Sequence, residues 1–118
     1  MKVWEKAHAL TLDVYKVTQR FPREELFGRT SQMRRCSVSI GANIPEGCGK
    51  KGNAEFQRFL QISSGSASEL DYHLLLAREL HFLSDADYRQ MTSSLSHLRR
   101  MLTSLLQKVD HERTMAKC

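Results

Sequence analysis

SQMRRCSVSIGANIPEGCGKKG, residues 31–52, is the stretch from which the fold can be worked out. It begins with the spacing of an amphipathic helix and ends in a glycine-rich basic loop. Small side chains lie between its apolar positions, at Ser37, Ser39, Gly41 and Ala42. Small residues let two helix backbones approach closely, although glycine costs a helix about 1 kcal/mol relative to alanine. We therefore predict a helix held by tight packing against a second helix and not by its own propensity.

The predicted partner is a long helix from Asn53 to about Phe82. Its middle, ISSGSASEL (residues 62–70), again carries small residues, and we expect these to face the small residues of the first stretch. The segment carries two apolar lines, which indicates burial on two sides, as in a central helix or at a subunit interface. One line is Phe56, Leu60, Ser63, Ala67, Leu70, Leu74, Ala77 and His81, and the other is Phe59, Ile62, Leu76, Leu80 and Leu83.

Two further segments, residues 3–19 and 84–110, carry the same stripe, with apolar residues alternately three and four positions apart. Ser84 is a predicted N-cap. Leu26 and Phe27, in the first connection, are expected to fold back onto the core. No alternating strand pattern occurs. The sequence therefore predicts an all-α protein, an antiparallel up-down-up-down four-helix bundle over residues 1–110 with a frayed C-terminal tail at 111–118.

Composition narrows the classes of partner. The 118-residue chain has a formal net charge of +5, which is typical of proteins that bind RNA or DNA, with a merely solvated basic surface as an equal alternative. Its cysteines, Cys36, Cys48 and Cys118, lack the spacing of a zinc site and are expected to be free thiols in a reducing compartment. No apolar run is long enough for a membrane helix. We expect a cytoplasmic protein with no membrane partner and no cofactor.

The runs SVSIGANIPEGCGK (residues 37–50) and EFQRFLQISSGSASELDYHLLLA (residues 55–77) resemble the bacterial four helix bundle protein family. The resemblance extends from Val3 to about Gln107. That family includes proteins encoded in intervening sequences of large-subunit ribosomal RNA genes, and it is related to the accessory variability proteins of diversity-generating retroelements. The resemblance implies a homopentamer with a central channel and no catalytic activity. For the retroelement branch it implies nucleic-acid binding through a basic surface and a reverse transcriptase partner.

Two positions depart from the family pattern. Pro45 stands where alanine is commoner, which predicts a bent end to the second helix. Lys50 and Lys51 stand where arginine followed by serine or threonine is commoner. Lysine supplies charge but lacks the planar fork that holds a phosphate with two hydrogen bonds, so selective phosphate recognition by this loop is less assured.

The candidate nucleic-acid contacts are basic residues of the loop and the helices. The glycines of residues 47–53 can expose backbone N–H groups to an anion, and a helix N-terminus follows. A flexible connection with solvated lysines is the favoured interpretation of this loop, because no recognised phosphate-binding motif fits, and phosphate contact is the alternative. The candidates are Lys50, Lys51, Arg34, Arg99 and Arg100.

A structural polar layer is expected between the second and third helices. One of the neighbouring arginines of the second helix is predicted to pair with Glu69. A metal or acid–base site formed with His73 is disfavoured, because di-metal bundles use Glu-x-x-His twice, whereas Glu69 and His73 are four residues apart and occur once. We predict no catalytic residue, metal ligand or cofactor site. The residues of the layer are Arg35, Asn43, Glu46, Ser66 and Glu69.

The functional expectation is a non-enzymatic homo-oligomer, by resemblance a pentamer, that associates with RNA or a ribonucleoprotein through backbone electrostatics. The alternative is a protein-interaction adaptor, for example one that docks a reverse transcriptase. An enzyme that uses the polar layer is a third hypothesis.

Overall fold

The computed structural model describes residues 2–44 and 53–117 of the chain. Within these residues there is no strand, which confirms the all-α fold class. A 3-10 turn, Arg23–Glu25, and a π-helical turn, Leu26–Thr30, join the first two helices. The four long helices are α1 (Lys2–Thr18), α2 (Ser31–Ala42), α3 (Asn53–Glu79) and α4 (Asp85–Lys117). None of the described helices combines the length and apolarity that a membrane span requires.

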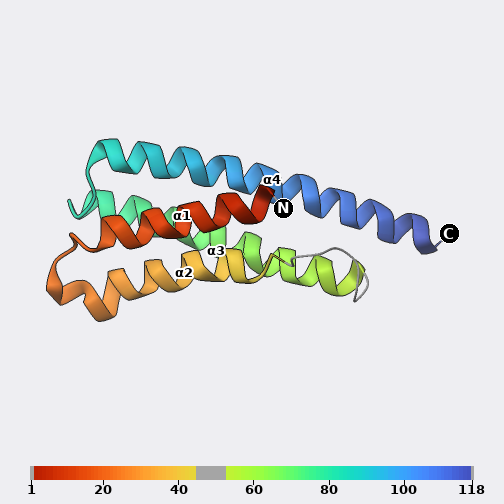
Figure 1. Cartoon of the computed structure of the whole chain (residues 1–118), viewed down its shortest axis with the longest axis horizontal. Helices are drawn as coiled ribbons and strands as arrows, with labels where there is room; N and C mark the ends of the chain where they lie inside the picture. The colour runs from red at the N-terminus through yellow and green to blue at the C-terminus, as the bar shows by residue number, and fades with distance from the viewer. Residues whose placement is uncertain (1, 45–52, 118) are drawn as a thin grey trace.

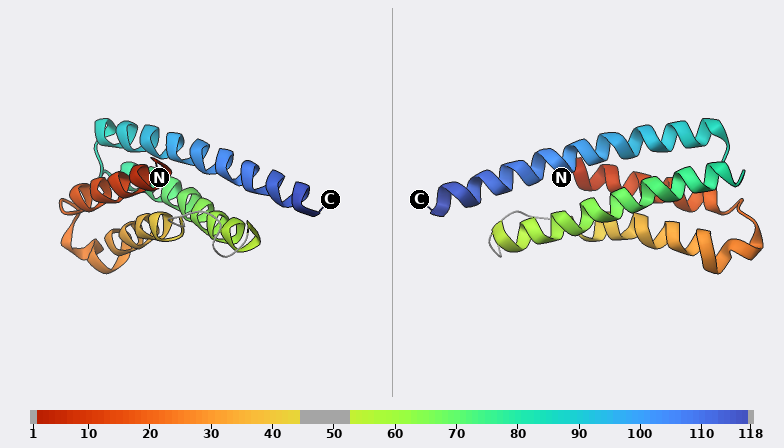
Figure 2. Two further views of the ribbon diagram at one scale, coloured as in Figure 1. Left: turned by 45° about the vertical axis from the view of Figure 1, so that its right-hand side comes forward. Right: turned by 180° about the vertical axis from the view of Figure 1, so that it is seen from behind.

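Each long helix runs opposite to the one before it (Figure 1). α3 packs against α2 and α4, and α1 packs against α2 and α4, so the four helices form a closed ring around one core. The C-terminal part of α4 extends past the first residues of α1, as both views of Figure 2 show. This elongated shape has principal extents of 54 × 23 × 19 Å.

The predicted apolar stripes form the core, except for the second line of α3, in which Ile62 (41% exposed) and Leu80 (46% exposed) lie outside it. Leu60, Leu70, Leu74, Leu98 and Leu102 each have 0% exposed surface. Complete burial of a leucine side chain contributes about 1.5–3 kcal/mol, so the leucines of α3 and α4 account for much of the stability of the bundle.

The small residues of α2 and α3 face each other as predicted. The Ser63 hydroxyl donates to the Ile40 carbonyl at 2.8 Å, and the Ser39 and Ser66 hydroxyls lie 2.8 Å apart. Gly65, between the two serines of α3, is different, because a Cβ atom built on it would meet nothing within 4 Å. Serine hydroxyls, and not the glycine of α3, therefore join the two helices.

The connection between α1 and α2 differs from expectation. Phe27 is 92% exposed and Leu26 is 46% exposed, so the prediction that they fold onto the core is wrong. The backbone of Gly28 departs from helical angles (φ −108°, ψ −107°), and the Glu25 side chain accepts a hydrogen bond from the Arg29 backbone N–H. This kinked turn continues directly into α2 and leaves the two apolar side chains outside the core.

α4 also differs, since it continues to Lys117, past the expected end at Asp110. The extension is tied to the start of α3. The Gln57 side chain donates to the Asp110 carboxylate at 3.2 Å, and Arg113 donates to the Gln57 side-chain carbonyl. These contacts explain why the helix persists where its apolar periodicity ends.

α3 ends before His81, which the sequence placed on the buried stripe. His81 is exposed, and its φ of 64° makes it the one non-glycine residue with positive φ in the described ranges. The His81 N–H donates to the Arg78 carbonyl and the Phe82 N–H to the Ala77 carbonyl, each at 2.9 Å. This pattern is a Schellman motif, in which glycine is the usual residue at the left-handed position.

We expect His81→Gly to raise the free energy of unfolding by about 1 kcal/mol, because glycine adopts the left-handed conformation without a Cβ penalty. Urea unfolding followed by circular dichroism measures the change. His97→Gly is the matched control, since the same substitution inside α4 should destabilise by a similar amount. A loss of stability in His81→Gly would contradict the backbone assignment.

Candidate functional site

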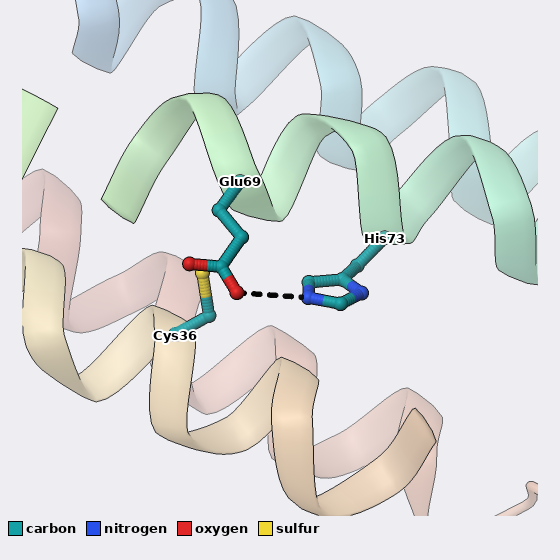
Figure 3. Close-up of side chains that lie close together, drawn as sticks. All are labelled: Cys36, Glu69 and His73. Carbon is teal, nitrogen blue, oxygen red and sulfur yellow. Dashed lines mark hydrogen bonds and ion pairs between the residues drawn. The ribbon is translucent and has the colours of Figure 1, made fainter. Parts of the chain in front are cut away.

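The main cluster of titratable side chains lies between α2 and α3, where Cys36, Glu69 and His73 point toward one another (Figure 3). The Cys36 thiol and the His73 ring are buried, whereas the Glu69 side chain is 64% exposed. His73 Nε2 lies 3.3 Å from Glu69 Oε1. On its other side, His73 Nδ1 lies 2.6 Å from Nη1 of Arg29, which comes from the turn before α2.

These contacts fix where the protons are. A guanidinium can only donate, so Nδ1 of His73 must accept from Arg29. The proton of the neutral ring is then on Nε2 and is donated to Glu69. The Cys36 Sγ lies 2.9 Å from the Ser66 carbonyl, which can only accept, so Cys36 is a protonated thiol.

Electrostatics agree with this assignment. Burial, with added repulsion from the neighbouring Glu69 carboxylate, raises the pKa of Cys36 to about 12. A nucleophilic cysteine needs a thiolate and therefore a lowered pKa. The surroundings of Cys36 raise its pKa and therefore do not supply a thiolate.

The same three residues are the candidate metal ligands, because their ligand atoms lie within 4.8 Å of one another. A metal would need the thiolate of Cys36 and the Nε2 lone pair of His73. Both atoms carry protons in this arrangement, and the Arg29 cation on Nδ1 opposes the tautomer that would free Nε2. The geometry fits a hydrogen-bonded layer better than a metal centre.

The predicted polar layer is assembled in two parts. The Asn43 side chain donates to the Ser39 carbonyl at 2.8 Å, and Ser39 contacts Ser66, so these residues form one group. Glu69 belongs to the cluster around His73. Glu46 lies outside the described residues.

The expected arginine–Glu69 pair is replaced by the His73–Glu69 contact. Arg34 instead donates to the Thr18 hydroxyl at 2.9 Å, and its guanidinium lies 4.6 Å from the centre of the Tyr15 ring. Arg35 is exposed and lines a hollow of about 260 Å³ beside Glu69 without forming an ion pair within the described ranges. Arg34, which is a predicted nucleic-acid contact, is therefore bonded to α1 within the protein.

Arg99 and Arg100 lie beside a hollow of about 660 Å³ on the outer face of α4. Arg99 is fixed by α3, because it donates to the Asp71 carboxylate at 3.4 Å and to the Ser68 hydroxyl at 2.8 Å. Arg100 donates to the Ser96 hydroxyl at 3.0 Å. Four hydroxyls complete the lining, those of Thr92, Ser96, Thr103 and Ser104.

A second hollow, of about 540 Å³, adjoins the first and shares Arg100 and Ser104 with it. It adds a further cation, Lys108, and the imidazole of His97. The loop candidates Lys50 and Lys51 lie outside the described residues.

Sequence reasoning missed Arg29 and the hydroxyls of α4. Arg29 gives no periodic signal, because it lies in the irregular turn before α2. Its Nε is buried and has no hydrogen-bond partner among the described residues. The hydroxyls were visible in principle, since Thr92, Ser96, Arg100 and Ser104 recur every four residues along one helix face.

Comparisons with known proteins give the family. The model of the 23S rRNA-intervening sequence protein family matches residues 1–104. A solved structure of similar fold is that of a protein of unknown function from the S23 ribosomal protein family of Bacteroides thetaiotaomicron VPI-5482. It has a TM-score of 0.77 and 23% sequence identity, over 89% of this chain and 95% of that one. Among curated proteins, none matches the chain significantly.

The similar structure supports the fold alone, whereas the family model covers most of the chain, including the first three long helices and the first part of α4. The chain therefore belongs to the 23S rRNA-intervening sequence protein family.

Proposed function

We propose that this protein is a non-enzymatic, homo-oligomeric bundle that associates with RNA through the phosphate backbone. The observation that carries the proposal is the pair of adjoining hollows on α4, whose linings include cations and hydroxyls, together with an acid in the first hollow and apolar side chains in the second. The net charge of +5 and the ribosomal RNA context in the family's name support the same partner. The protonated Cys36 in the largest titratable cluster supports the absence of catalysis.

Exposed apolar residues support the oligomer. Leu12 (58% exposed) lies on α1 and Val38 (44%) on α2, whereas Tyr72 (62%) and Leu75 (38%) lie on α3. Different apolar surfaces on different helices suit a head-to-tail contact, which closes into a ring when the rotation allows. A pentamer is the ring size we propose, and a light-scattering mass near 13.6 kDa, that of one chain, would contradict any ring.

A second candidate function, a protein-interaction adaptor, is favoured by one observation. Phe27 is 92% exposed at the tip of the α1–α2 connection, next to the half-exposed Leu26. Such a tip suits an apolar protein partner, of which a reverse transcriptase is one candidate. Retained RNA affinity in Phe27→Ser would separate this surface from RNA binding.

The RNA proposal predicts strong salt dependence. We expect affinity for a structured RNA to fall steeply between about 50 and 200 mM salt, with a slope proportional to the number of phosphates neutralised. Fluorescence anisotropy with a labelled RNA hairpin measures it. Binding that is undiminished above roughly half-molar salt would contradict the electrostatic mechanism.

A further inference from the structure

We propose that the outer face of α4 binds the phosphate backbone of duplex RNA, through a strip formed by Ser96, Arg100, Thr103, Ser104 and Lys108 (the α4 strip). This inference rests on the proposed function and specifies its surface and ligand. The strip spans about 18 Å along the helix at 1.5 Å per residue. Arg100 and Ser104 lie at its centre, because both hollows share them.

The cations of the α4 strip are available to bind an anion. Among the described residues, neither Arg100 nor Lys108 forms an ion pair. The acid that lines the first hollow, Asp71, is already bonded to Arg99. An anion entering the hollow therefore meets an uncompensated guanidinium and a carboxylate that is already neutralised.

Two exposed arginines of α3 are engaged elsewhere. Arg78 pairs with Asp85 at 2.9 Å, and the guanidinium of Arg58 lies 5.1 Å from the centre of the Phe59 ring. The Arg78 contact also lowers the pKa of the Asp85 carboxyl. Of the cations that line the two hollows on α4, Arg100 and Lys108 are the two without an ion pair within the described ranges.

The hydroxyls of the α4 strip can also donate hydrogen bonds to phosphate. Phosphate oxygens accept hydrogen bonds from serine, threonine and arginine side chains, and such contacts position a protein on nucleic acid without reading its sequence. Ser96 also accepts a hydrogen bond from Arg100, which orients the guanidinium along the hollow. Neutral donors beside an oriented cation suit a chain of phosphates better than they suit an acidic peptide, whose carboxylates are borne on variable side chains.

The lining of the two hollows suits a duplex better than a single strand. Proteins that bind single strands stack bases on aromatic side chains. Neither hollow is lined by a phenylalanine, tyrosine or tryptophan. A surface without aromatic side chains for bases to stack on suits a duplex, which is recognised through its phosphates and shape.

The test measures anisotropy of a labelled 20-base-pair RNA duplex with the full chain. Arg100→Gln should lower affinity about tenfold and reduce the salt slope by about one phosphate contact. Arg23→Gln is the matched control, because it removes a guanidinium from the turn between α1 and α2, outside both hollows. Lys108→Gln compared with Lys16→Gln on α1 repeats the comparison for lysine.

Removing the hydroxyls should change the affinity for RNA without changing its salt dependence. The double variant Ser96→Ala, Thr103→Val should weaken binding several-fold with an unchanged salt slope, because neutral donors release no counterions. Circular dichroism shows whether each variant keeps its helices. Equal losses in Arg100→Gln and Arg23→Gln would overturn the α4 strip but leave RNA binding in place. Absence of RNA binding by the unaltered chain would overturn the proposed function itself, and tighter binding of single-stranded RNA would overturn the duplex assignment.

Discussion

Cys36 should react with iodoacetamide at pH 8 about a hundredfold more slowly than an unhindered cysteine, in a chain where Cys48→Ser and Cys118→Ser leave it as the single thiol. Its pKa of about 12 lowers the thiolate fraction about a thousandfold relative to an ordinary thiol. The greater nucleophilicity of a high-pKa thiolate restores about 25-fold of that rate. Burial of Cys36, at 6% exposed surface, adds to the protection.

The pH dependence of the alkylation rate shows whether the pKa of Cys36 is raised or lowered. An ordinary thiol, with a pKa near 9, approaches its full rate at about pH 10, whereas the rate of Cys36 should continue to rise toward pH 12. Glu69→Gln removes the neighbouring negative charge and should speed the reaction at pH 8, although desolvation, the larger cause of the raised pKa, remains. Unfolding in urea is the control that should restore the ordinary rate. A Cys36 that reacts at that rate while folded would contradict the protonated thiol and reopen the question of a nucleophile.

The fold was largely predictable because helix periodicity is local. Each stripe needs only residues three and four positions apart, and tertiary burial of Leu60, Leu70 and Leu98 follows directly from it. The capping of α4 was equally visible, since the Ser84 hydroxyl accepts from the Asp87 N–H at 3.1 Å. His81 shows the limit, because the stripe placed it in the core, whereas α3 has already ended and His81 is exposed in a left-handed conformation.

The side-chain partners were not predictable for a different reason. Arg34 had a carboxylate to pair with in principle, Glu69, yet it donates to Thr18 on α1. A long side chain can bond to either of two neighbouring helices. The choice depends on the rotation of its own helix about the helix axis, which the sequence spacing does not determine. Arg29 was missed for other reasons, because it lies in the irregular turn before α2 and its partner His73 lies 44 positions away in the chain.

The largest loss of stability is expected from Leu74→Ala. Leu74 has 0% exposed surface in the C-terminal third of α3, and replacing a buried leucine by alanine removes apolar burial and leaves a cavity, at a cost of about 2–5 kcal/mol. A domain of this size is stable by about 5–15 kcal/mol in total. Urea unfolding should therefore shift strongly to lower denaturant concentration.

Leu75→Ala is the matched control, since it makes the same substitution one position along the helix on a side chain that is 38% exposed. In an isolated chain it should cost less than about 1 kcal/mol, because little burial is lost. If α3 forms a subunit contact, Leu75→Ala should instead lower the mass measured by light scattering at low protein concentration, which Leu74→Ala would do only by unfolding the chain. Equal unfolding losses in the two variants at every protein concentration would mean that Leu75 is as buried as Leu74 and that this side of α3 belongs to the core.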